Sequence, residues 1–464
     1  MTEQPNILFI MSDDHAAHAM SCYGSKINKT PNLDRIATEG MRFDNCYVTN
    51  SICSPSRAAI LTGTYNHINQ VTTTWSHLDN LLPNLAKHLQ VGGYQTGMIG
   101  KWHLGHDENS TPAGFDYWCI LPGQGEYHDP EMIEMGETKK FPGYATDIIT
   151  DKSIAWLEAR DQDKPFFLMC HHKAPHRPWE PDDKHADMYE DEDIRVPESF
   201  DDDYKNRAKA AAAAKMRMTD LRPEDIKEPV PEGLTPEEEK HWRYQRYIKD
   251  YLKCVASVDD NVGNILDYLD ENGLTENTIV VYTSDQGFFL GDHGWFDKRF
   301  MYEESMQMPF VIKYPKKIKP GSVCDDIICN VDFAPTFLEL AGLTIPSYMQ
   351  GVNFSSLLQG VTPDDWRQCA YYRYWVNQDG SHNVFAHYGI RTKTHKLIYF
   401  YNKGCGTLNA NPGTEEPEWE LFDLEKDPLE LFNEYNTPEY QDKVKELTLE
   451  LNRTMAHIGD IPLH

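Results

Sequence analysis

The stretch SICSPSRAAILTG, residues 51–63, places Cys53 and Arg57 one helical turn apart. Pro55 suits the first turn of a helix and Ser54 is a suitable N-cap residue, so we expect a helix to begin here. The N-terminus of a helix with a guanidinium one turn along attracts anions. A cysteine in such a place is expected to react, or to be converted into a reactive group, rather than to serve as a small core residue.

One kind of cysteine chemistry is excluded by spacing. Phosphatases that use a thiolate nucleophile carry an arginine six positions after the cysteine, so that one loop surrounds the phosphate. Position 59 of this chain is Ala59, and Arg57 comes too early. The stretch is therefore not a thiolate-phosphatase loop.

Charged or polar side chains also follow three predicted buried strands, at residues 13–14, 101–103 and 285–287. Open α/β sheets bind ligands at the carboxyl ends of their strands. Hard divalent cations prefer several oxygen ligands, so the sequence predicts a metal site at this edge. The oxygens available for it are those of Asp13, Asp14, Asp285 and Gln286.

The elements that must position these residues alternate between strands and helices. Strands are predicted at PNILFIMSDD, at the end of QVGGYQTGMIGKWHLG, at PFFLMCHH and at NTIVVYTSDQG, with helices near 147–160 and 240–272. The second helix carries a sustained apolar stripe at helical spacing. This alternation predicts an α/β fold with a large, mostly parallel sheet that is sandwiched by helices.

Two segments differ in composition from the alternating strands and helices. Residues 180–240 are acidic and marked by prolines, and are either an excursion beside the substrate opening or a solvated insertion. Residues 362–464 contain short aromatic-rich strands and a terminal helix near 438–457, which predicts a small antiparallel sheet with one helix. We therefore expect a catalytic domain at 1–361 and an α+β subdomain at 362–464.

Composition restricts the classes of partner. The formal net charge of −29 disfavours nucleic acid, and any anion site must be a local positive island. Ten cysteines show no disulfide-framework spacing, and the first residues resemble no signal peptide. No stretch of membrane-spanning length follows, so we expect no membrane partner and a cytoplasmic location unless a signal peptide has been removed.

Several motifs together resemble one family. SICSPSRAAILTG matches the C-x-P-S-R…L-T-G signature of type I sulfatases, in the alkaline phosphatase-like superfamily. GMIGKWHLG is similar to their second signature, KAPHRPW to their Pro-His-x-Pro segment, and GDHGWFDKRFMYEES to the segment that carries a late lysine. The match covers about residues 5–345, and EWELFDLEKDP resembles the tail of these enzymes.

The resemblance implies that a maturing enzyme oxidises Cys53 to formylglycine, which hydrates to a geminal diol. One hydroxyl attacks sulfur and the alcohol leaves; deprotonation of the other hydroxyl then releases sulfate and regenerates the aldehyde. The implied cation is Ca²⁺, with Mg²⁺ as the alternative. The ligands implied for it are Asp13, Asp14, Cys53, Asp285 and Gln286, although the family commonly has Asn or His at the last position.

Roles for the remaining polar residues follow from the same resemblance. Arg57 and Lys101 hold the oxygen of the diol, and Lys298 contacts the sulfate. His176 is the acid that protonates the leaving alcohol, with His171 or His172 as alternatives, and His103 is the base for elimination. His293 is expected to order its loop.

The substrate is expected to be a sulfate monoester on a carbohydrate, because the segment HHKAPHRPWEP resembles glycan sulfatases, including relatives of N-acetylglucosamine-6-sulfatase. Lys101, His176, Lys298, Arg177 and Trp179 are the predicted substrate-binding residues. Residues 372–375, YRYW, either line a sugar-sized pocket or belong to the core. The competing hypotheses are a phosphonate monoester or phosphodiester hydrolase of the same superfamily and a non-catalytic glycan-binding protein.

Overall fold

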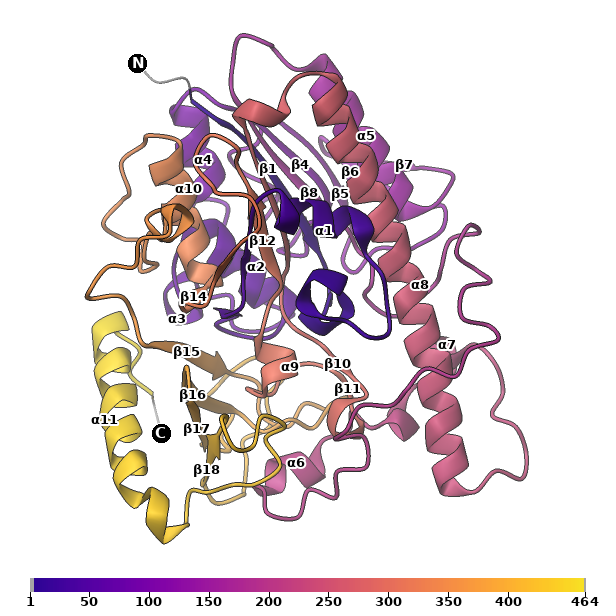
Figure 1. The fold of residues 1–464 in the computed structure, drawn as a ribbon, viewed down its shortest axis with the longest axis vertical. Helices are drawn as coiled ribbons and strands as arrows, with labels where there is room; N and C mark the ends of the chain where they lie inside the picture. Colours follow the sequence, from indigo (N-terminus) through magenta and orange to yellow (C-terminus); the bar gives the residue numbers. More distant parts are fainter. Residues whose placement is uncertain (1–3, 463–464) are drawn as a thin grey trace.

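A ten-stranded sheet forms the centre of the computed structural model, which describes residues 4–462 (Figure 1). The central strands are parallel, and antiparallel neighbours lie toward both edges. The strand order across the sheet is β13 (Ser322–Cys324), β2 (Met41–Phe43), β12 (Phe310–Lys313), β9 (Thr278–Ser284), β1 (Asn6–Ser12), β8 (Phe166–His171), β4 (Gln95–Lys101), β5 (Tyr117–Leu121), β6 (Glu131–Glu134) and β7 (Glu137–Lys140).

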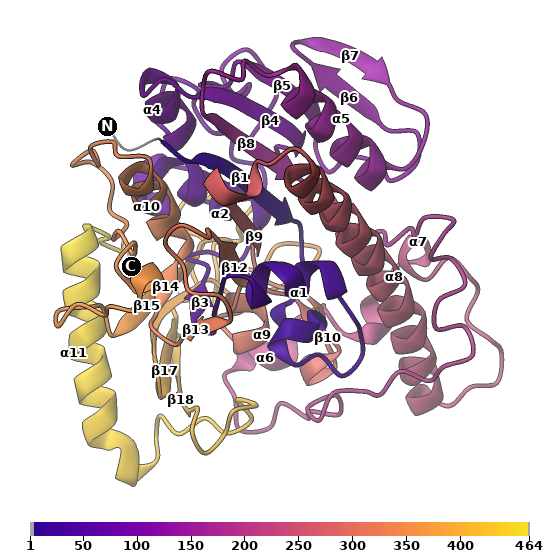
Figure 2. The same cartoon turned by 45° about the horizontal axis from the view of Figure 1, so that its top comes forward.

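Both faces of the central strands are buried, because helices cover each face of the sheet (Figure 2). Along β1, Ile7 and Phe9 belong to one core and Leu8 and Ile10 to the other, which is the period-two alternation of a strand. The helices on the first face are α2 (Cys53–Thr62), α4 (Leu85–Val91) and α10 (Phe333–Leu340). Those on the second face are α1 (Pro31–Thr38), α5 (Ala145–Ala159) and α8 (Pro236–Glu271).

The long helix α8 begins where its sequence favours a helix start. Thr235 and Glu238 form a reciprocal capping box, and Pro236 occupies the first turn. Its predicted stripe, from Tyr247 to Leu269, is buried. The predictions of this helix and of the helix near 147–160 are therefore confirmed.

The C-terminal part forms a separate four-stranded antiparallel sheet of β15 (Cys369–Tyr374), β16 (His387–Thr392), β17 (His395–Phe400) and β18 (Glu418–Asp423). Helix α11 (Gln441–Ile458) packs on it through Val444, Leu447 and Leu451. The predicted fold class is confirmed, including the terminal helix. The domain boundary at residue 361 stays a prediction.

The acidic segment 180–240 contributes side chains to both cores and carries two short helices, α6 (Lys209–Ala213) and α7 (Pro223–Ile226), before α8 begins. It is more than a solvated insertion, because Ala210, Ala211 and Asp225 are buried. The smaller remaining elements are α3 (Asn66–Asn69), α9 (Glu303–Met306), β3 (Cys46–Tyr47), β10 (Phe289–Leu290), β11 (Phe296–Asp297) and β14 (Ile328–Cys329).

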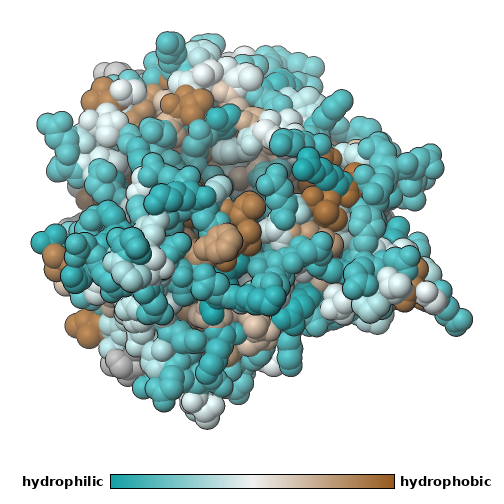
Figure 3. Space-filling view, turned by 60° about the horizontal axis from the view of Figure 1, so that its bottom comes forward, coloured by the Kyte–Doolittle hydropathy of each residue, from teal (hydrophilic) through white to brown (hydrophobic). Residues whose placement is uncertain are grey.

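One face of the molecule is mostly hydrophilic, with hydrophobic groups scattered over it (Figure 3). Across residues 4–462, no helix combines the length and apolarity that crossing a bilayer requires. All ten cysteines lie in this range and are free thiols, as their spacing predicted.

Candidate functional site

Four adjacent parallel strands, β9, β1, β8 and β4, end at the same edge of the large sheet. Asp285 and Gln286 follow β9, and Asp13 and Asp14 follow β1. Strand β8 leads into the segment that carries His176, and β4 ends at Lys101 itself. The topology therefore brings together the three sequence segments that were predicted to meet.

Helix α2 begins at Cys53, with Ile52 in the N-cap position. The prediction that Ser54 is the N-cap is wrong: its hydroxyl lies within the first turn and donates to the carbonyl of Thr74 at 3.4 Å. Pro55 is in the first turn, as expected. Cys53 is thus placed at the positive end of the helix dipole.

The Cys53 side chain is buried and is held as a thiol. Burial, together with the charge of Asp13, raises the pKa of Cys53 to about 11. A thiolate is the nucleophilic form of cysteine, so this environment opposes catalysis by sulfur itself. The structure thus provides a second reason, beyond spacing, against a thiolate mechanism.

Arg57 connects three of the strand ends. Its Nε donates to Asp285 Oδ2 at 3.0 Å, its Nη2 to Asp13 Oδ2 at 3.2 Å, and its Nη1 to the carbonyl oxygen of Lys101. The guanidinium is buried and is absent from the pocket wall. Arg57 therefore fixes the carboxylates beside Cys53, and its predicted contact with the diol stays a prediction.

Lys101 is fully buried, and its Nζ contacts Asp13 and the side-chain oxygen of Gln124. Sequence reasoning missed Gln124. A signal for it was present, because Gln124 follows β5, which runs parallel to β4 and ends beside it. The rule that identified the other strand ends applies to this one too.

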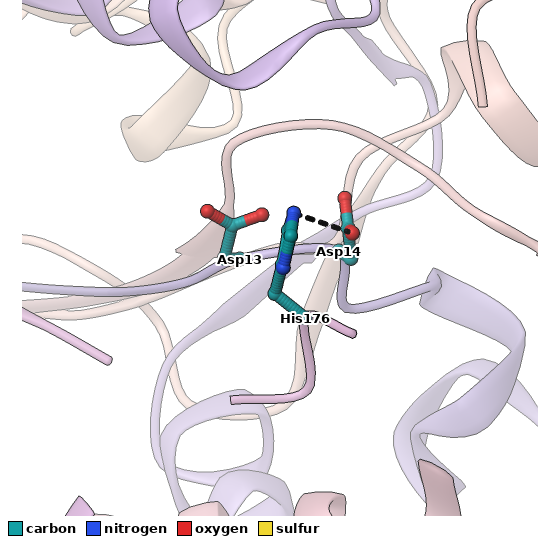
Figure 4. Close-up of side chains that lie close together, drawn as sticks. All are labelled: Asp13, Asp14 and His176. Carbon is teal, nitrogen blue, oxygen red and sulfur yellow. Dashed lines mark ion pairs between the residues drawn. The ribbon is translucent and has the colours of Figure 1, made fainter. Parts of the chain in front are cut away.

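Asp13, Asp14 and His176 offer ligand atoms that all lie within 4.8 Å of one another (Figure 4). Asp13 Oδ1 and Gln286 Oε1 are buried and have no hydrogen-bond partner within residues 4–462. Unpartnered buried oxygens are costly unless a cation or water satisfies them. This donor set, with its carboxylate and amide oxygens, fits a hard divalent cation.

The predicted ligand set is only partly brought together. Cys53 and Asp285 lie outside the group that shares the 4.8 Å limit, and His176 lies inside it. The two oxygens of Asp285 accept hydrogen bonds from the backbone N–H of Asp14 and from Arg57. Gln286 is adjacent, because its amide donates to Asp14 Oδ1.

The formal charges at this edge balance. Burial raises the pKa of Asp14 to about 7 against the opposing charge of Lys298, and burial with the charge of Asp13 raises the pKa of Asp285 to about 6. A divalent cation would stabilise the ionised carboxylates and leave the site net positive, which suits an anionic substrate. The charged groups are Arg57, Lys101 and Lys298 against Asp13, Asp14 and Asp285.

His176 reaches the site on its Nε2 side. Its Nδ1 lies 2.7 Å from the carbonyl oxygen of Arg177, so Nδ1 carries the proton, and Nε2 is 3.9 Å from Asp14 Oδ2. Burial and the charge of Lys101 hold the pKa of His176 well below its usual range. His171 and His172 are buried and do not line the pocket.

His103 follows β4 in the left-handed region, with φ of 52°. Such a conformation is uncommon for histidine and frequently marks a functional site. Burial and the charge of Lys101 hold the pKa of His103 well below its usual range, and Nδ1 has no hydrogen-bond partner within the described residues. This neutral ring is suited to accept a proton.

Lys298 comes from the segment after β11, and its Nζ contacts Asp14. Burial opposes its charged form, but the carboxylates of Asp14 and Asp297 outweigh burial and raise the pKa of Lys298. The ammonium therefore remains charged beside the carboxylates and faces the pocket.

A pocket of about 350 Å³ opens beside Cys53. Its wall combines the strand-end site with the acidic segment 180–240 and with the C-terminal part of the chain. It is lined by Ile52, Cys53, Thr74, Trp75, Gln124, His176, Arg177, Pro178, Arg222, Glu224, Asp225, Asp297, Lys298, Arg299, Asp379, Ser381 and His382.

Two residues that were predicted to bind substrate lie in different surroundings. Arg177 lines the pocket, and its Nε donates to Asp225 at 3.0 Å. Trp179 is fully buried against Tyr247, with ring centroids 4.6 Å apart. The prediction that Trp179 binds substrate is contradicted, because this ring belongs to the core.

Residues 372–375 also lie away from the pocket wall. Tyr372 and Tyr374 are buried, and Arg373 stacks on Trp375, 3.6 Å from its ring centroid. Of the two interpretations of YRYW, the core one holds. His293 orders its loop as expected, with Nδ1 2.9 Å from Asp202.

Several residues of the pocket wall were not predicted. Asp297 and Arg299 flank Lys298 in a segment that the sequence had already singled out. No comparable signal marked Trp75, Arg222 or His382, since their positions depend on how three separate parts of the chain pack together.

Comparison with known proteins agrees with this geometry. Residues 5–343 match the sulfatase family, and residues 291–457 match the C-terminal region of N-sulphoglucosamine sulphohydrolase. The chain is 44% identical to an N-acetylglucosamine-6-O-sulfatase of Bacteroides thetaiotaomicron, over 99% of this chain and 88% of that protein.

Solved structures extend the comparison. A protein in complex with its substrate D-glucosamine-2-N,6-O-disulfate superposes with a TM-score of 0.91 at 44% identity, over 99% of both chains. The phosphonate monoester hydrolase of Agrobacterium radiobacter, at 22% identity and a TM-score of 0.76 over 98% of this chain and 96% of that one, shares the fold. This chain belongs to the sulfatase family and is a sulfuric ester hydrolase, not a non-catalytic binding protein.

Proposed function

We propose that the chain hydrolyses the 6-O-sulfate ester of a glucosamine-type sugar, using formylglycine made from Cys53 and one Ca²⁺ ion. The observation that carries the proposal is the pocket of sugar size in which Cys53, His176 and Lys298 line one wall. The 44% identity to an N-acetylglucosamine-6-O-sulfatase across nearly the whole chain supports this choice of sugar.

Two groups beyond the chain supply part of the chemistry. Formylglycine, made by a maturing enzyme, provides in its hydrated form a hydroxyl that attacks sulfur and a second hydroxyl whose deprotonation releases sulfate. A bound cation would polarise the sulfate oxygens and favour ionisation of the attacking hydroxyl. Asp13, Asp14 and Gln286 would hold this ion, with Asp285 positioned beside them by Arg57.

The chain's own residues bind the substrate and move its protons. The buried ammonium of Lys298 stabilises negative charge on the sulfate oxygens. The neutral ring of His103 accepts the proton of the second hydroxyl at position 53. The Nε2 atom of His176 protonates the leaving sugar oxygen, because the arriving negative charge of the ester favours its protonated form.

Substrate selection tests the reaction class. We expect the matured enzyme to turn over N-acetylglucosamine 6-sulfate on the order of 10²-fold or more faster, in kcat/KM, than the matched 6-phosphate, because the two esters differ by one charge at neutral pH. Release of sulfate and phosphate is measured in parallel assays. Equal or faster release from phosphate or phosphonate esters would instead place this chain with the phosphonate and phosphodiester hydrolases.

The role of His176 predicts a dependence on the leaving group. His176→Ala should lower kcat by roughly 10²- to 10⁴-fold on the sugar sulfate. It should lower kcat much less on an aryl sulfate, whose phenolate leaves without a proton. His457→Ala, an exposed position on α11, is the matched control. The same loss on both substrates would argue against His176 as the acid, and His172→Ala then tests the alternative.

Metal binding can be measured from the unfolding temperature, without an activity assay. Addition of Ca²⁺ to chelator-treated protein should raise the unfolding temperature, because a ligand at 100 times its Kd stabilises the folded state by about 2.7 kcal/mol. Asp14→Asn should abolish the shift, and Asp183→Asn, in an exposed acidic stretch, should retain it. A larger shift with Mg²⁺ would overturn the choice of ion, and no shift with either would count against this site.

A further inference from the structure

The rim of the pocket carries an exposed tryptophan that the proposed chemistry does not use. Trp75 is 48% exposed, whereas the other nine tryptophans, all within residues 4–462, are buried or half-buried. It is also the only exposed large hydrophobic side chain among the described residues that line this pocket. Single apolar groups on a surface are ordinary, so its location must carry the argument.

The backbone around Trp75 is attached to the turn that presents Cys53. Asn50 Nδ2 donates to the carbonyl of Thr72, and Ser54 Oγ to the carbonyl of Thr74, both at 3.4 Å. Within the loop, the N–H of Trp75 donates to Thr73 Oγ1 at 3.2 Å. The backbone that carries the indole is therefore tied to the turn that presents the reacting residue.

The rest of the rim leaves about half of this side chain exposed. Across residues 4–462, no aromatic ring pairs with Trp75 and no cation lies over it. Tryptophan presents a large, flat and rigid apolar surface, and it is enriched where proteins bind ligands. An open indole at a polar rim is suited to a flat partner that has one apolar face.

The size of the pocket indicates what that partner is. A volume of about 350 Å³ lies near the lower end of the range for small-molecule sites, about 300–1,000 Å³, so it suits one sugar. The next unit of a glycan would then lie at the rim. A pyranose has a face of C–H groups that packs on an aromatic ring.

We propose that Trp75 forms a second sugar-binding site, which holds the unit joined to the sulfated sugar through C1. This inference rests on the proposed function for its first sugar. The inference predicts that the protein binds the ends of oligosaccharides more tightly than free monosaccharides.

Binding to a variant that cannot turn over substrate tests this site. In the full chain with Cys53→Ala and Ca²⁺, calorimetry compares N-acetylglucosamine 6-sulfate with the disaccharide that links it through C1 to galactose. Adding Trp75→Ala should weaken binding of the disaccharide about three- to tenfold and change that of the monosaccharide less than twofold. Trp75→Phe should retain most of the disaccharide affinity.

Leu81→Ala is the control, because Leu81 is 84% exposed on the same stretch of chain and lies outside the pocket wall. Equal weakening for both sugars would mean that Trp75 belongs to the first site, and an unchanged disaccharide affinity would mean that the ring is bare surface. Either result overturns the inference, as does failure of both sugars to bind.

Turnover separates this inference from the proposed function. If the matured enzyme releases no sulfate from the monosaccharide but cleaves an aryl sulfate, the proposed sugar ester is wrong. In that case the calorimetric comparison still decides whether Trp75 contributes a second site, provided that the disaccharide binds.

Discussion

Opposite charges buried together at the carboxyl ends of four parallel strands set the conditions for the rest of the site. A buried charge that loses its partner typically costs about 3–5 kcal/mol, so these groups cannot be varied one at a time. Arg57 contacts two carboxylates at once, and Lys101 contacts one of them. The carboxylates that would bind the cation and the helix that presents Cys53 are thereby held as one unit.

The small C-terminal sheet is joined to this charged cluster by ion pairs to the segment that carries Lys298. Glu303, five residues later, pairs with Arg391 of β16 at 3.0 Å and with Lys396 of β17 at 2.9 Å. Burial opposes ionisation there, but these two cations lower the pKa of Glu303 to about 2. The second sheet therefore fixes the segment that carries Lys298, and the loop between β15 and β16 adds His382 to the pocket wall.

What could be predicted from the sequence follows from local rules. Asp13 and Asp285 were identified because each ends a continuous apolar run, and parallel strands end at one edge. Ser54 was misassigned as an N-cap because its hydroxyl bonds to Thr74, a contact that depends on tertiary packing. Trp179 was assigned to substrate although α8, far away in sequence, buries it. The pocket wall was the least predictable part, since it combines three segments that meet only in the folded chain.

The thiol environment of Cys53 leads to the central claim. Its place at a helix start among cations favours a reactive group, whereas burial and the charge of Asp13 raise the pKa of the thiol and oppose a sulfur nucleophile. Together these features suit a residue that is chemically replaced. The most direct measurement is the mass of the peptide containing Cys53, taken from protein produced together with an active formylglycine-generating enzyme. The account predicts that the thiol is replaced by an aldehyde. An unmodified cysteine under those conditions would contradict it, because the site would then lack its nucleophile.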